Sequence, residues 1–441
     1  MSLSPPEKLQ KLQRALHAKA KQFPQQRFHA LYDKVYRGDV LAHAYACCRA
    51  NGGAAGVDGQ RLEDIETYGL ERWLEELTQE LRNKTYRPSA VRRVYIPKPD
   101  GKQRPLGIPT VKDRVVQTAA MLILEPIFEA DLAEEQYAYR PQRSALDAVK
   151  RVHGLLCRGH GQVIDADLSG YFDSIPHAEL MRSVARRVVD GAMLHLIKMW
   201  LVAPVEEPPD EHGKSRRTTR NRDTGRGTPQ GAPISPLLSN LYMRRFILGW
   251  QSLGYARRWG AQIVNYADDF VICCRHEAQE AMVVMQQMMQ RLKLTVNEAK
   301  THICQIPKET FDFLGYTFGR CYSWKDGRPF IGTRPSAKRL ARIREAISMM
   351  TQRNTTGATA EELVRSLNRM LVGWANYFSL GPVSRAYQSV DRHVRYRLRQ
   401  WLRAKHGQGR IDYKTHSDAY LEQELGLVPL ASGRRRAWAK A

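Results

Sequence analysis

Two adjacent carboxylates, Asp268 and Asp269, follow Tyr266-Ala267 and lie between the apolar segments IV and FVICC. Alternation along a strand sends neighbouring side chains to opposite faces, so both acids serve one site only at a tight turn. Two acids side by side in an apolar hairpin are costly unless a cation compensates them, and hard divalent ions prefer oxygen ligands. Taken alone, the tetrapeptide fits an exposed turn equally well, because aspartate is common there.

Further acids in VIDADLSGYFDSIPH (163–177) favour the cation site. Asp167 ends an apolar strand and shares a strand face with Asp165, which leaves one of them as a ligand and the other as a structural group. A strand-end carboxylate together with a carboxylate pair on a hairpin suits two metal ions that promote phosphoryl transfer. In RGTPQGAPISPLLSN (226–240), the turn Gln230-Gly231 lets the backbone approach a nucleotide or a template.

The elements that position these residues follow from hydrophobic periodicity and turn residues. Strands are predicted at 91–96, 163–167 and, as a hairpin, 261–274. Helices are predicted at 1–38, 39–50, 61–83, 112–131, 177–202, 235–252 and 278–292. The segment 204–227 is polar and rich in proline and arginine, which predicts a long exposed loop or hairpin. Beyond about residue 330 the sequence predicts long basic helices.

The 441 residues carry a formal net charge of +24, which indicates a polyanionic partner such as nucleic acid. Residues 331–441 contribute +13 of that charge. The seven cysteines form no CxxC pair, so the sequence supports neither a zinc site nor a disulfide framework, and a reducing cytosolic setting is expected. No run of 18 apolar residues and no apolar N-terminal segment is present, which predicts neither a membrane span nor a secretory signal.

Taken in order, the motifs resemble those of reverse transcriptases encoded by bacterial group II introns, over roughly residues 26–441. The motif YxDD alone also occurs in retroviral, retron and telomerase-like enzymes. The combination of motifs is specific to the lineage: it comprises RPLGIP (104–109), YADD (266–269), NEAKT (297–301), FLGY (313–316) and GWANYF (373–378). The chain ends at LASGRRRAWAKA without Cys/His pairs, so we expect a form that lacks the HNH endonuclease and primes from existing DNA ends.

The resemblance implies a role for each motif residue. Asp167, Asp268 and Asp269, with the backbone carbonyl of Leu168, would bind two Mg²⁺ ions, with Mn²⁺ as an alternative. Lys98 and Arg104 would hold the triphosphate of a dNTP, since both are suited to phosphate. Phe172 would exclude a ribose 2′-OH, and Gln230 would position the nucleotide or the template. Lys300 is either a general acid for pyrophosphate departure or a surface lysine, and Arg140 and Arg143 would touch the template.

The basic C-terminal part would bind intron RNA. Arg392, Arg395, Arg399 and Arg403 recur at helical spacing, which predicts an RNA-contacting face; a solvated cationic face is the alternative. Trp374 and Tyr377 lie in an amphipathic stripe, which favours core packing over base stacking. The other partners implied are an RNA template, a DNA primer or target and dNTPs, with no membrane. The oligomeric state is left open, and a ribonucleoprotein in the bacterial cytosol or nucleoid is expected.

The fold class predicted from the resemblance is α+β, a right-hand polymerase with a small antiparallel palm sheet. Its expected parts are an N-terminal extension with the start of the fingers (1–85), fingers (86–160), palm with the insertion 204–227 (161–325), helical thumb (326–405) and basic tail (406–441). The predicted function is RNA-directed DNA synthesis, with maturase activity in splicing and retrohoming. The alternatives are a host enzyme for defence, CRISPR spacer acquisition or DNA repair, and a splicing factor that only binds RNA.

Overall fold

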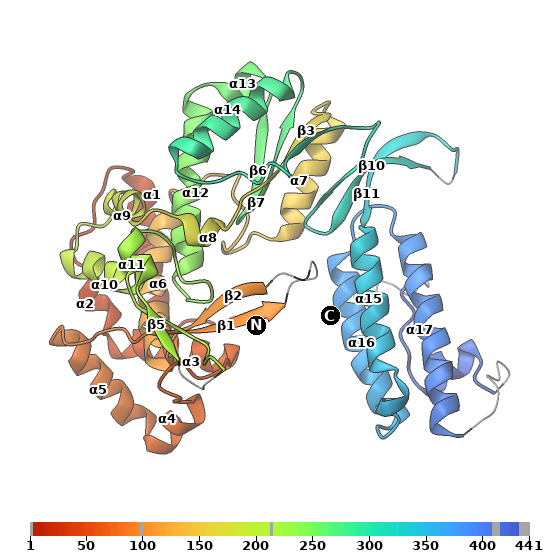
Figure 1. Cartoon of the computed structure of the whole chain (residues 1–441), viewed down its shortest axis with the longest axis horizontal. Coiled ribbons are helices and arrows are strands. Elements are labelled where there is room, and N and C mark those ends of the chain that lie inside the picture. Colours follow the sequence, from red (N-terminus) through yellow and green to blue (C-terminus); the bar gives the residue numbers. More distant parts are fainter. Residues whose placement is uncertain are drawn as a thin grey trace.

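The computed structural model describes residues 3–97, 101, 103–211, 215–323, 325–407 and 415–431. Helices dominate, and small sheets lie among them, as the α+β prediction requires. The N-terminal helices and the last three long helices lie at opposite ends of the long axis (Figure 1), with the strands β3 and β6–β11 between them.

The elements follow in chain order. The N-terminal helices are α1 (Glu7–Gln22), α2 (Tyr32–Val35), α3 (Gly38–Asn51), α4 (Leu62–Tyr68) and α5 (Leu70–Arg82). Then come β1 (Val91–Pro97), β2 (Gln103–Ile108), α6 (Val111–Glu129), α7 (Ala145–Cys157), β3 (Gln162–Asp167), α8 (Tyr171–Ser174), α9 (His177–Ala185) and α10 (Gly191–Leu201). The middle of the chain contains β4 (Val205–Glu207), β5 (Arg216–Thr218), α11 (Arg220–Thr224), α12 (Ser235–Ser252), α13 (Tyr255–Arg258), β6 (Gln262–Tyr266), β7 (Asp269–Cys274) and α14 (Ala278–Arg291).

The remaining strands and helices complete the chain. They are β8 (His302–Gln305), β9 (Phe311–Phe313), β10 (Tyr316–Tyr322), β11 (Pro329–Pro335), α15 (Ala337–Met350), α16 (Ala360–Tyr377) and α17 (Ser384–Lys405), with a 3₁₀ turn at Arg353–Thr355 and a π-helical turn at Tyr420–Glu424.

The central sheet has the strand order β6-β7-β3-β8, and all its neighbours are antiparallel. Strand β7 reads as a nearly continuous apolar run because both of its faces are covered. Phe270 and Ile272 of β7 point into a core shared with α12 and α14, whereas Val271 and Cys273 point into a second core with α7 and β9–β10. Alternate residues of one strand therefore anchor it in two cores, which fixes its register.

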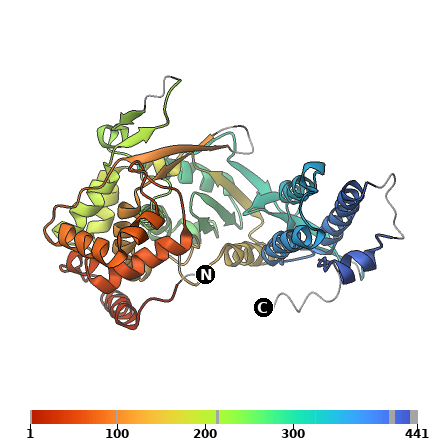
Figure 2. The same ribbon diagram turned by 90° about the horizontal axis from the view of Figure 1, so that it is seen from below.

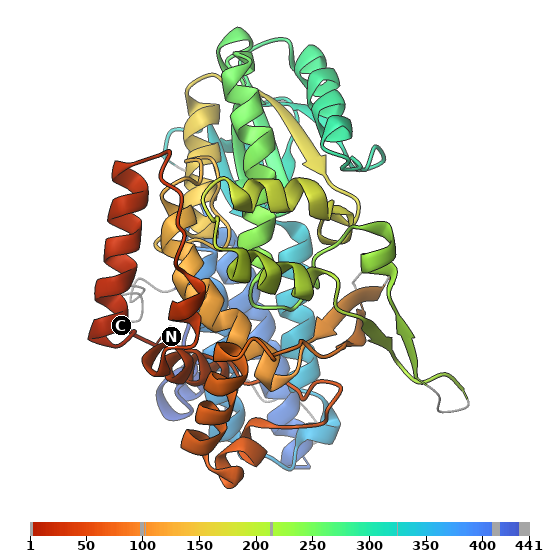
Figure 3. The same cartoon turned by 90° about the vertical axis from the view of Figure 1, so that its left-hand side faces the viewer.

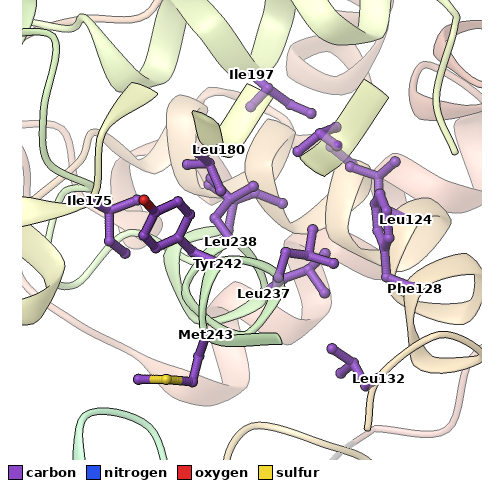
Figure 4. Close-up of a cluster of buried hydrophobic side chains, with 14 of the residues drawn as sticks. Leu124, Phe128, Leu132, Ile175, Leu180, Ile197, Leu237, Leu238, Tyr242 and Met243 are labelled. Carbon is purple, nitrogen blue, oxygen red and sulfur yellow. The ribbon is translucent and has the colours of Figure 1, made fainter. Parts of the chain in front are cut away.

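Helix α12 crosses the interior beneath this sheet and meets α6, α9 and α10 in a large apolar cluster. Figure 4 shows Leu237, Leu238 and Tyr242 of α12 between Leu180 on one side and Leu124 and Phe128 of α6 on the other. Helix α6 has 13 buried residues among its 19. The helix predicted at 112–131 is therefore present but buried around most of its circumference, because α1, α2 and α3 pack on it in addition to α12.

Two other helix predictions are corrected by breaks in the chain. The segment 61–83 forms two helices, because Gly69 takes φ +107° between α4 and α5, a conformation that favours glycine. The segment 177–202 also forms two helices, and Asp190 begins the second by accepting hydrogen bonds from the backbone N–H groups of Ala192 and Met193. By contrast, α12 has the predicted bounds, 235–252.

The last three long helices pack around an apolar core of their own. A capping box begins α16, where Thr359 and Glu362 exchange side-chain and backbone hydrogen bonds. Trp374 packs against both this core and the core of β9–β10, so the prediction of core packing is confirmed. Leu421 and Leu430 are fully buried here, so residues 415–431 of the predicted basic tail belong to the thumb core.

A buried arginine fixes the N-terminal helix to the rest of the chain. The Arg187 side chain is 3 % exposed, and its Nε lies 2.9 Å from an Asp131 carboxylate oxygen. One terminal nitrogen, Nη1, donates hydrogen bonds to the carbonyl oxygens of Phe23, Pro24 and Gln26 at 2.7–3.0 Å, and the other donates to the Ala20 carbonyl. One side chain therefore satisfies the carbonyl groups that follow the end of α1.

We predict that Arg187→Met lowers the free energy of unfolding by roughly 3–5 kcal/mol, because it leaves the Asp131 carboxylate and several buried carbonyls without a donor. Urea unfolding followed by circular dichroism measures the change. The control is Arg186→Met at the exposed neighbouring position, which should stay within about 0.5 kcal/mol of the parent protein. Equal losses for both variants would contradict the assignment of Arg187 as an anchor.

Candidate active site

The structure brings the predicted acids together at one end of the central sheet. Asp167, the last residue of β3, lies directly opposite Asp269, the first residue of β7. Tyr266 and Asp269 close a two-residue hairpin in which Ala267 takes φ +60°, a region that non-glycine residues seldom occupy. Asp268 occupies the second position of that turn and is exposed. The tight turn that the sequence required for two neighbouring acids is therefore present.

Burial and, to a smaller extent, the charges of neighbouring acids disfavour the ionised forms of Asp269 and Asp165. Burial, followed by the charges of Asp165, Asp268 and Asp167, raises the pKa of Asp269 to about 7. Burial and the neighbouring Asp167 raise the pKa of Asp165 to about 6, against an opposing contribution from His302. The chain therefore compensates the negative charge at this end of the sheet only in part. A bound cation would lower the free-energy cost of ionising these acids.

The segment 297–301 partly supplies this compensation. Lys300 Nζ lies 3.3 Å from an Asp167 carboxylate oxygen, and the Lys300 side chain is 60 % exposed. Asn297 donates a side-chain hydrogen bond to the same carboxylate at 3.0 Å and a backbone hydrogen bond to the Asp167 carbonyl at 2.8 Å. Sequence reasoning missed Asn297, although it is the first residue of the NEAKT motif. The segment 297–301 therefore fixes the end of β3 through Asn297 and also places Lys300 beside Asp167.

Backbone geometry leaves one further oxygen near the acids. Leu168 and Val296 form an antiparallel bridge whose hydrogen bonds run between their neighbours, Ser169 N–H to Thr295 and Asn297 N–H to Asp167. In such a pair the carbonyl of the bridging residue points away from its partner, so the Leu168 carbonyl lies on the edge facing β7. A backbone carbonyl beside carboxylates is a donor set for a hard divalent ion.

Among the residues that the structure describes, no group of three or more His, Cys, Asp or Glu side chains is arranged to hold a metal ion. Mg²⁺ at sites of phosphate transfer takes one or two carboxylates and completes its shell with water and substrate phosphates. The paired acids and the Leu168 carbonyl fit an ion of that kind.

Phe172 and Gln230, predicted to contact the nucleotide, are each held by neighbouring segments of the chain. Phe172 is half-buried on α8, and its carbonyl accepts a hydrogen bond from the backbone N–H of Thr228 at 2.8 Å. Gln230 donates a side-chain hydrogen bond to Asp173 at 3.2 Å, and its carbonyl accepts from the backbone N–H of Gly107 at 2.6 Å. A Cβ atom at Gly231 would lie 2.5 Å from the Gly107 carbonyl oxygen, so only glycine allows this approach.

The cationic residues of the hairpin β1–β2 are only partly described. Arg104 is exposed on β2, and Lys98 lies outside the described residues. Arg104 acts electrostatically on the half-exposed Tyr139, whose pKa is raised chiefly by burial and also by Asp268. Tyr139 therefore faces both the acids and the predicted triphosphate-binding cation. Sequence reasoning missed it, although it directly precedes Arg140 in the chain.

The prediction that Arg140 contacts the template is wrong. Its side chain is 5 % exposed and pairs with Glu129 at 2.6 Å, and it also donates to the backbone carbonyls of Ala133 and Gln136. Arg143 is half-buried, donates to the Glu134 carbonyl at 2.7 Å and lies over the Tyr137 ring. Its template contact stays a prediction.

Two of the four arginines predicted to contact RNA are also engaged within the chain. Arg399 is buried and pairs with Asp418, and Arg395 pairs with Glu422 at 2.6 Å. For Arg399 the prediction is wrong, because its side chain is 8 % exposed and Asp418 holds it inside. The Arg395 side chain is 24 % exposed, and its RNA contact stays a prediction. Arg392 is exposed and Arg403 is half-buried. RNA contact by those two stays a prediction.

Comparison with known proteins identifies the fold. Residues 96–318 match the family described as reverse transcriptase (RNA-dependent DNA polymerase), and this match contains the acids, Phe172, Gln230 and Arg104. The chain belongs to the reverse transcriptase family. Residues 340–420 match the group II intron maturase-specific domain. The predicted right-hand polymerase fold and the predicted RNA-directed DNA polymerase are thereby confirmed, and enzymes of this family generally use divalent metals.

The chain is similar to several proteins encoded in introns. It is 35 % identical to the group II intron-encoded protein LtrA of Lactococcus lactis over 230 residues, which are 50 % of this chain and 35 % of LtrA. It is 29 % identical to the putative COX1/OXI3 intron 1 protein of Saccharomyces cerevisiae over 205 residues, which are 46 % of this chain and 23 % of that protein. The matched part is thus about a third or less of each of these two relatives.

Two further similarities differ in coverage. Protein YkfC of Escherichia coli is 31 % identical over 368 residues, which cover 75 % of this chain and 93 % of YkfC. Among solved structures, a chain of the partial Cas6-RT-Cas1–Cas2 complex is 22 % identical and covers 60 % of this chain with a TM-score of 0.35, which is too low to bear on function. None of the helices described is long and apolar enough to cross a membrane.

We predict that Asp269→Asn stabilises the metal-free protein at about pH 8, by a few degrees in Tm. A carboxyl group whose pKa is raised from 3.8 to about 7 on folding costs stability as the pH rises through that range, and the amide removes this cost. The difference in Tm should shrink as the pH falls and vanish below about pH 3, where the Asp269 carboxyl is neutral in both the folded and the unfolded state.

The control is Glu298→Gln, an exposed residue of the neighbouring segment 297–301, which should leave Tm unchanged at both pH values. Added Mg²⁺ should raise the Tm of the parent protein more than that of Asp269→Asn. A variant that is less stable than the parent at about pH 8 without metal would contradict the proposed charge repulsion.

Proposed function

We propose that this chain is a group II intron-encoded reverse transcriptase that copies RNA into DNA and binds its intron RNA as a maturase, in support of splicing and retrohoming. The observation that carries the polymerase assignment is the meeting of Asp167 with Asp268 and Asp269 at one sheet end, inside the segment that matches the reverse transcriptase family. The group II intron maturase-specific domain at 340–420 supports the RNA-binding role.

In the proposed mechanism, Asp167, Asp268 and Asp269 hold two Mg²⁺ ions together with the Leu168 carbonyl, and Mn²⁺ would suit the same oxygen ligands. When bound, such ions lower the pKa of the primer 3′-hydroxyl and neutralise the triphosphate and the leaving pyrophosphate.

The other residues of the site bind and orient the nucleotide. Arg104 and Lys98 bind the triphosphate, and Phe172 stands beside the sugar to exclude a 2′-hydroxyl. Gln230, which is held by contacts with Asp173 and Gly107, would position the nucleotide or the template. Lys300 is exposed enough to reach a phosphate oxygen, where it would donate a proton to the leaving pyrophosphate.

The maturase role rests on charge as well as on the matched domain. Residues 331–441 carry a net charge of +13, and intron RNA is recognised largely through its phosphates and shape. Among the four arginines predicted for this contact, Arg392 is exposed and Arg403 is half-buried, which supports their use in RNA binding. The other proposed partners are an RNA template, a DNA primer or target and dNTPs, with the ribonucleoprotein in the bacterial cytosol or nucleoid.

Primer extension tests the polymerase. We predict that the purified protein, given an RNA template, a DNA primer, dNTPs and Mg²⁺, extends the primer, and that Asp268→Ala with Asp269→Ala lowers the rate by at least about a thousandfold, since both metal-binding carboxylates are lost. Circular dichroism of the double variant should match that of the parent protein.

Two outcomes would revise the assignment. If the parent protein does not extend primers under any metal or salt condition but binds intron RNA tightly, the protein is a splicing factor without polymerase activity. If it extends primers but does not bind the RNA that flanks its coding sequence, a host reverse transcriptase is the better description.

We predict that Arg392→Gln with Arg403→Gln weakens binding of the RNA transcribed from the flanking DNA, and that the slope of log Kd against log salt falls by roughly one to two. Filter binding at several salt concentrations measures both quantities. The matched control is Arg27→Gln, an exposed arginine of the N-terminal segment. An unchanged salt slope in the double variant would remove both residues from the RNA interface.

A further inference from the structure

The insertion 204–227 is built into the sheet that carries the predicted triphosphate-binding residues. β4 pairs in parallel with β1 through Val91↔Val205 and Arg92↔Glu206, and β5 pairs with β4, so the sheet has the order β2-β1-β4-β5. Figure 2 shows β4 and β5 beside the strands β1 and β2, and Figure 3 shows the same hairpin from the side, projecting from the body of the molecule.

The last residue of β4 contacts two side chains of β1. One carboxylate oxygen of Glu207 accepts a hydrogen bond from the Tyr95 hydroxyl at 3.0 Å, and the other lies 3.6 Å from Arg93 Nε. The Arg93 side chain is 15 % exposed, so its charge needs a counter-ion. Glu207 therefore neutralises the charge of Arg93 and fixes the side chain of Tyr95 through a hydrogen bond.

Arg93 also acts on the palm side of the site. Burial raises the pKa of Asp173, and the charges of Arg93 and of Arg220, which begins α11 of the insertion, oppose that rise. Asp173 is the residue after Phe172, and it accepts the side-chain hydrogen bond of Gln230. Arg93 thus lies close to Glu207 of the insertion and also acts electrostatically on Asp173. Asp173 directly follows Phe172, the residue predicted to exclude a ribose 2′-OH.

The other end of the insertion is attached to the palm as well. The backbone N–H of His177 donates to the Gly225 carbonyl at 2.8 Å, and that of Gly227 donates to the Ile175 carbonyl at 2.9 Å. The insertion therefore connects β1 at one end with the segment that follows α8 at the other. A segment attached at both ends in this way restricts the distance between the ribbon β1–β2 and Phe172.

We propose that Glu207 is a positioning residue for the incoming deoxynucleotide, and that the insertion 204–227 is a brace that holds the ribbon β1–β2 at a fixed distance from the palm. The brace fixes the position of Arg104 on β2, which binds the triphosphate. That position is fixed relative to Phe172 and Gln230, which contact the rest of the nucleotide. Glu207 acts through Arg93 and Tyr95 and does not itself touch substrate. This inference rests on the proposed polymerase function.

Steady-state primer extension separates this role from a structural one. Glu207→Ala should raise the KM for dNTP about fivefold while kcat stays within about twofold, because a displaced ribbon weakens triphosphate binding and leaves the metal-binding acids in place. Glu207→Gln keeps an acceptor for Tyr95 but loses the charge that faces Arg93, so its KM should lie between those of the parent protein and the alanine variant.

The matched control is Glu206→Gln. Glu206 is the neighbouring residue of β4 and pairs instead with Arg217, whose side chain is 67 % exposed. Its KM should equal that of the parent protein. The proposal would be overturned if Glu207→Ala had the same KM as the parent protein. It would also be overturned if the KM rose equally in Glu207→Ala and Glu206→Gln. A weaker template affinity with a reduced salt slope in Glu207→Ala would also overturn it, since the insertion would then be a nucleic-acid-binding arm.

Hydrogen exchange of the free protein tests the brace without any catalysis. Glu207→Ala should speed amide exchange in β1 and β2 several-fold, whereas exchange in β3 and β7 stays unchanged. Unchanged exchange in β1 and β2 would overturn the brace even if the parent protein proved inactive. An inactive parent with faster exchange in the variant would refute the polymerase assignment alone, so the two failures are distinguishable.

Discussion

Mutual repulsion of carboxylates at one end of the central sheet is the constraint on which the rest of the molecule depends. Asp167 and Asp269 lie opposite each other, and Asp165 and Asp268 add further charge. Such a group separates unless the backbone that carries it is held rigidly. The sheet provides that rigidity because alternate residues of β3 and β7 are buried in two separate cores, one with α12 and α14 and the other with α7.

The positive charges of the chain are arranged around this acidic site at several distances. Lys300 lies beside Asp167, Arg104 lies on the neighbouring ribbon, and the basic C-terminal helices form the far end of the molecule. A nucleic acid backbone and a triphosphate bring negative charge to the cationic surfaces, whereas divalent ions serve the acids. The net positive charge of the chain therefore favours the binding of polyanionic partners. Only the acidic end of the central sheet repels them, and there a divalent cation between the acids and the phosphates would be required.

The geometry of the nucleotide site depends on backbone contacts between distant segments. Gly107 of β2 meets the Gln230 carbonyl, Thr228 meets the Phe172 carbonyl, and the insertion joins β1 to the palm. None of these contacts involves Asp167, Asp268 or Asp269, so the residues proposed to position the nucleotide and those proposed to hold the cations belong to separate parts of the structure. Variants of Glu207 and Asp269 probe the two separately.

The sequence alone determined the strand end at Asp167, the tight turn at Asp268, the bounds of α12 and the basic character of the C-terminal part, because these follow from local periodicity, turn chemistry and composition. Only the tertiary structure decided which arginines are engaged within the chain. Arg140 and Arg399 look like surface cations in the sequence, but Glu129 and Asp418 hold them inside. The pairing of Glu207 with Tyr95 joins residues more than a hundred positions apart, and no local pattern records such a contact.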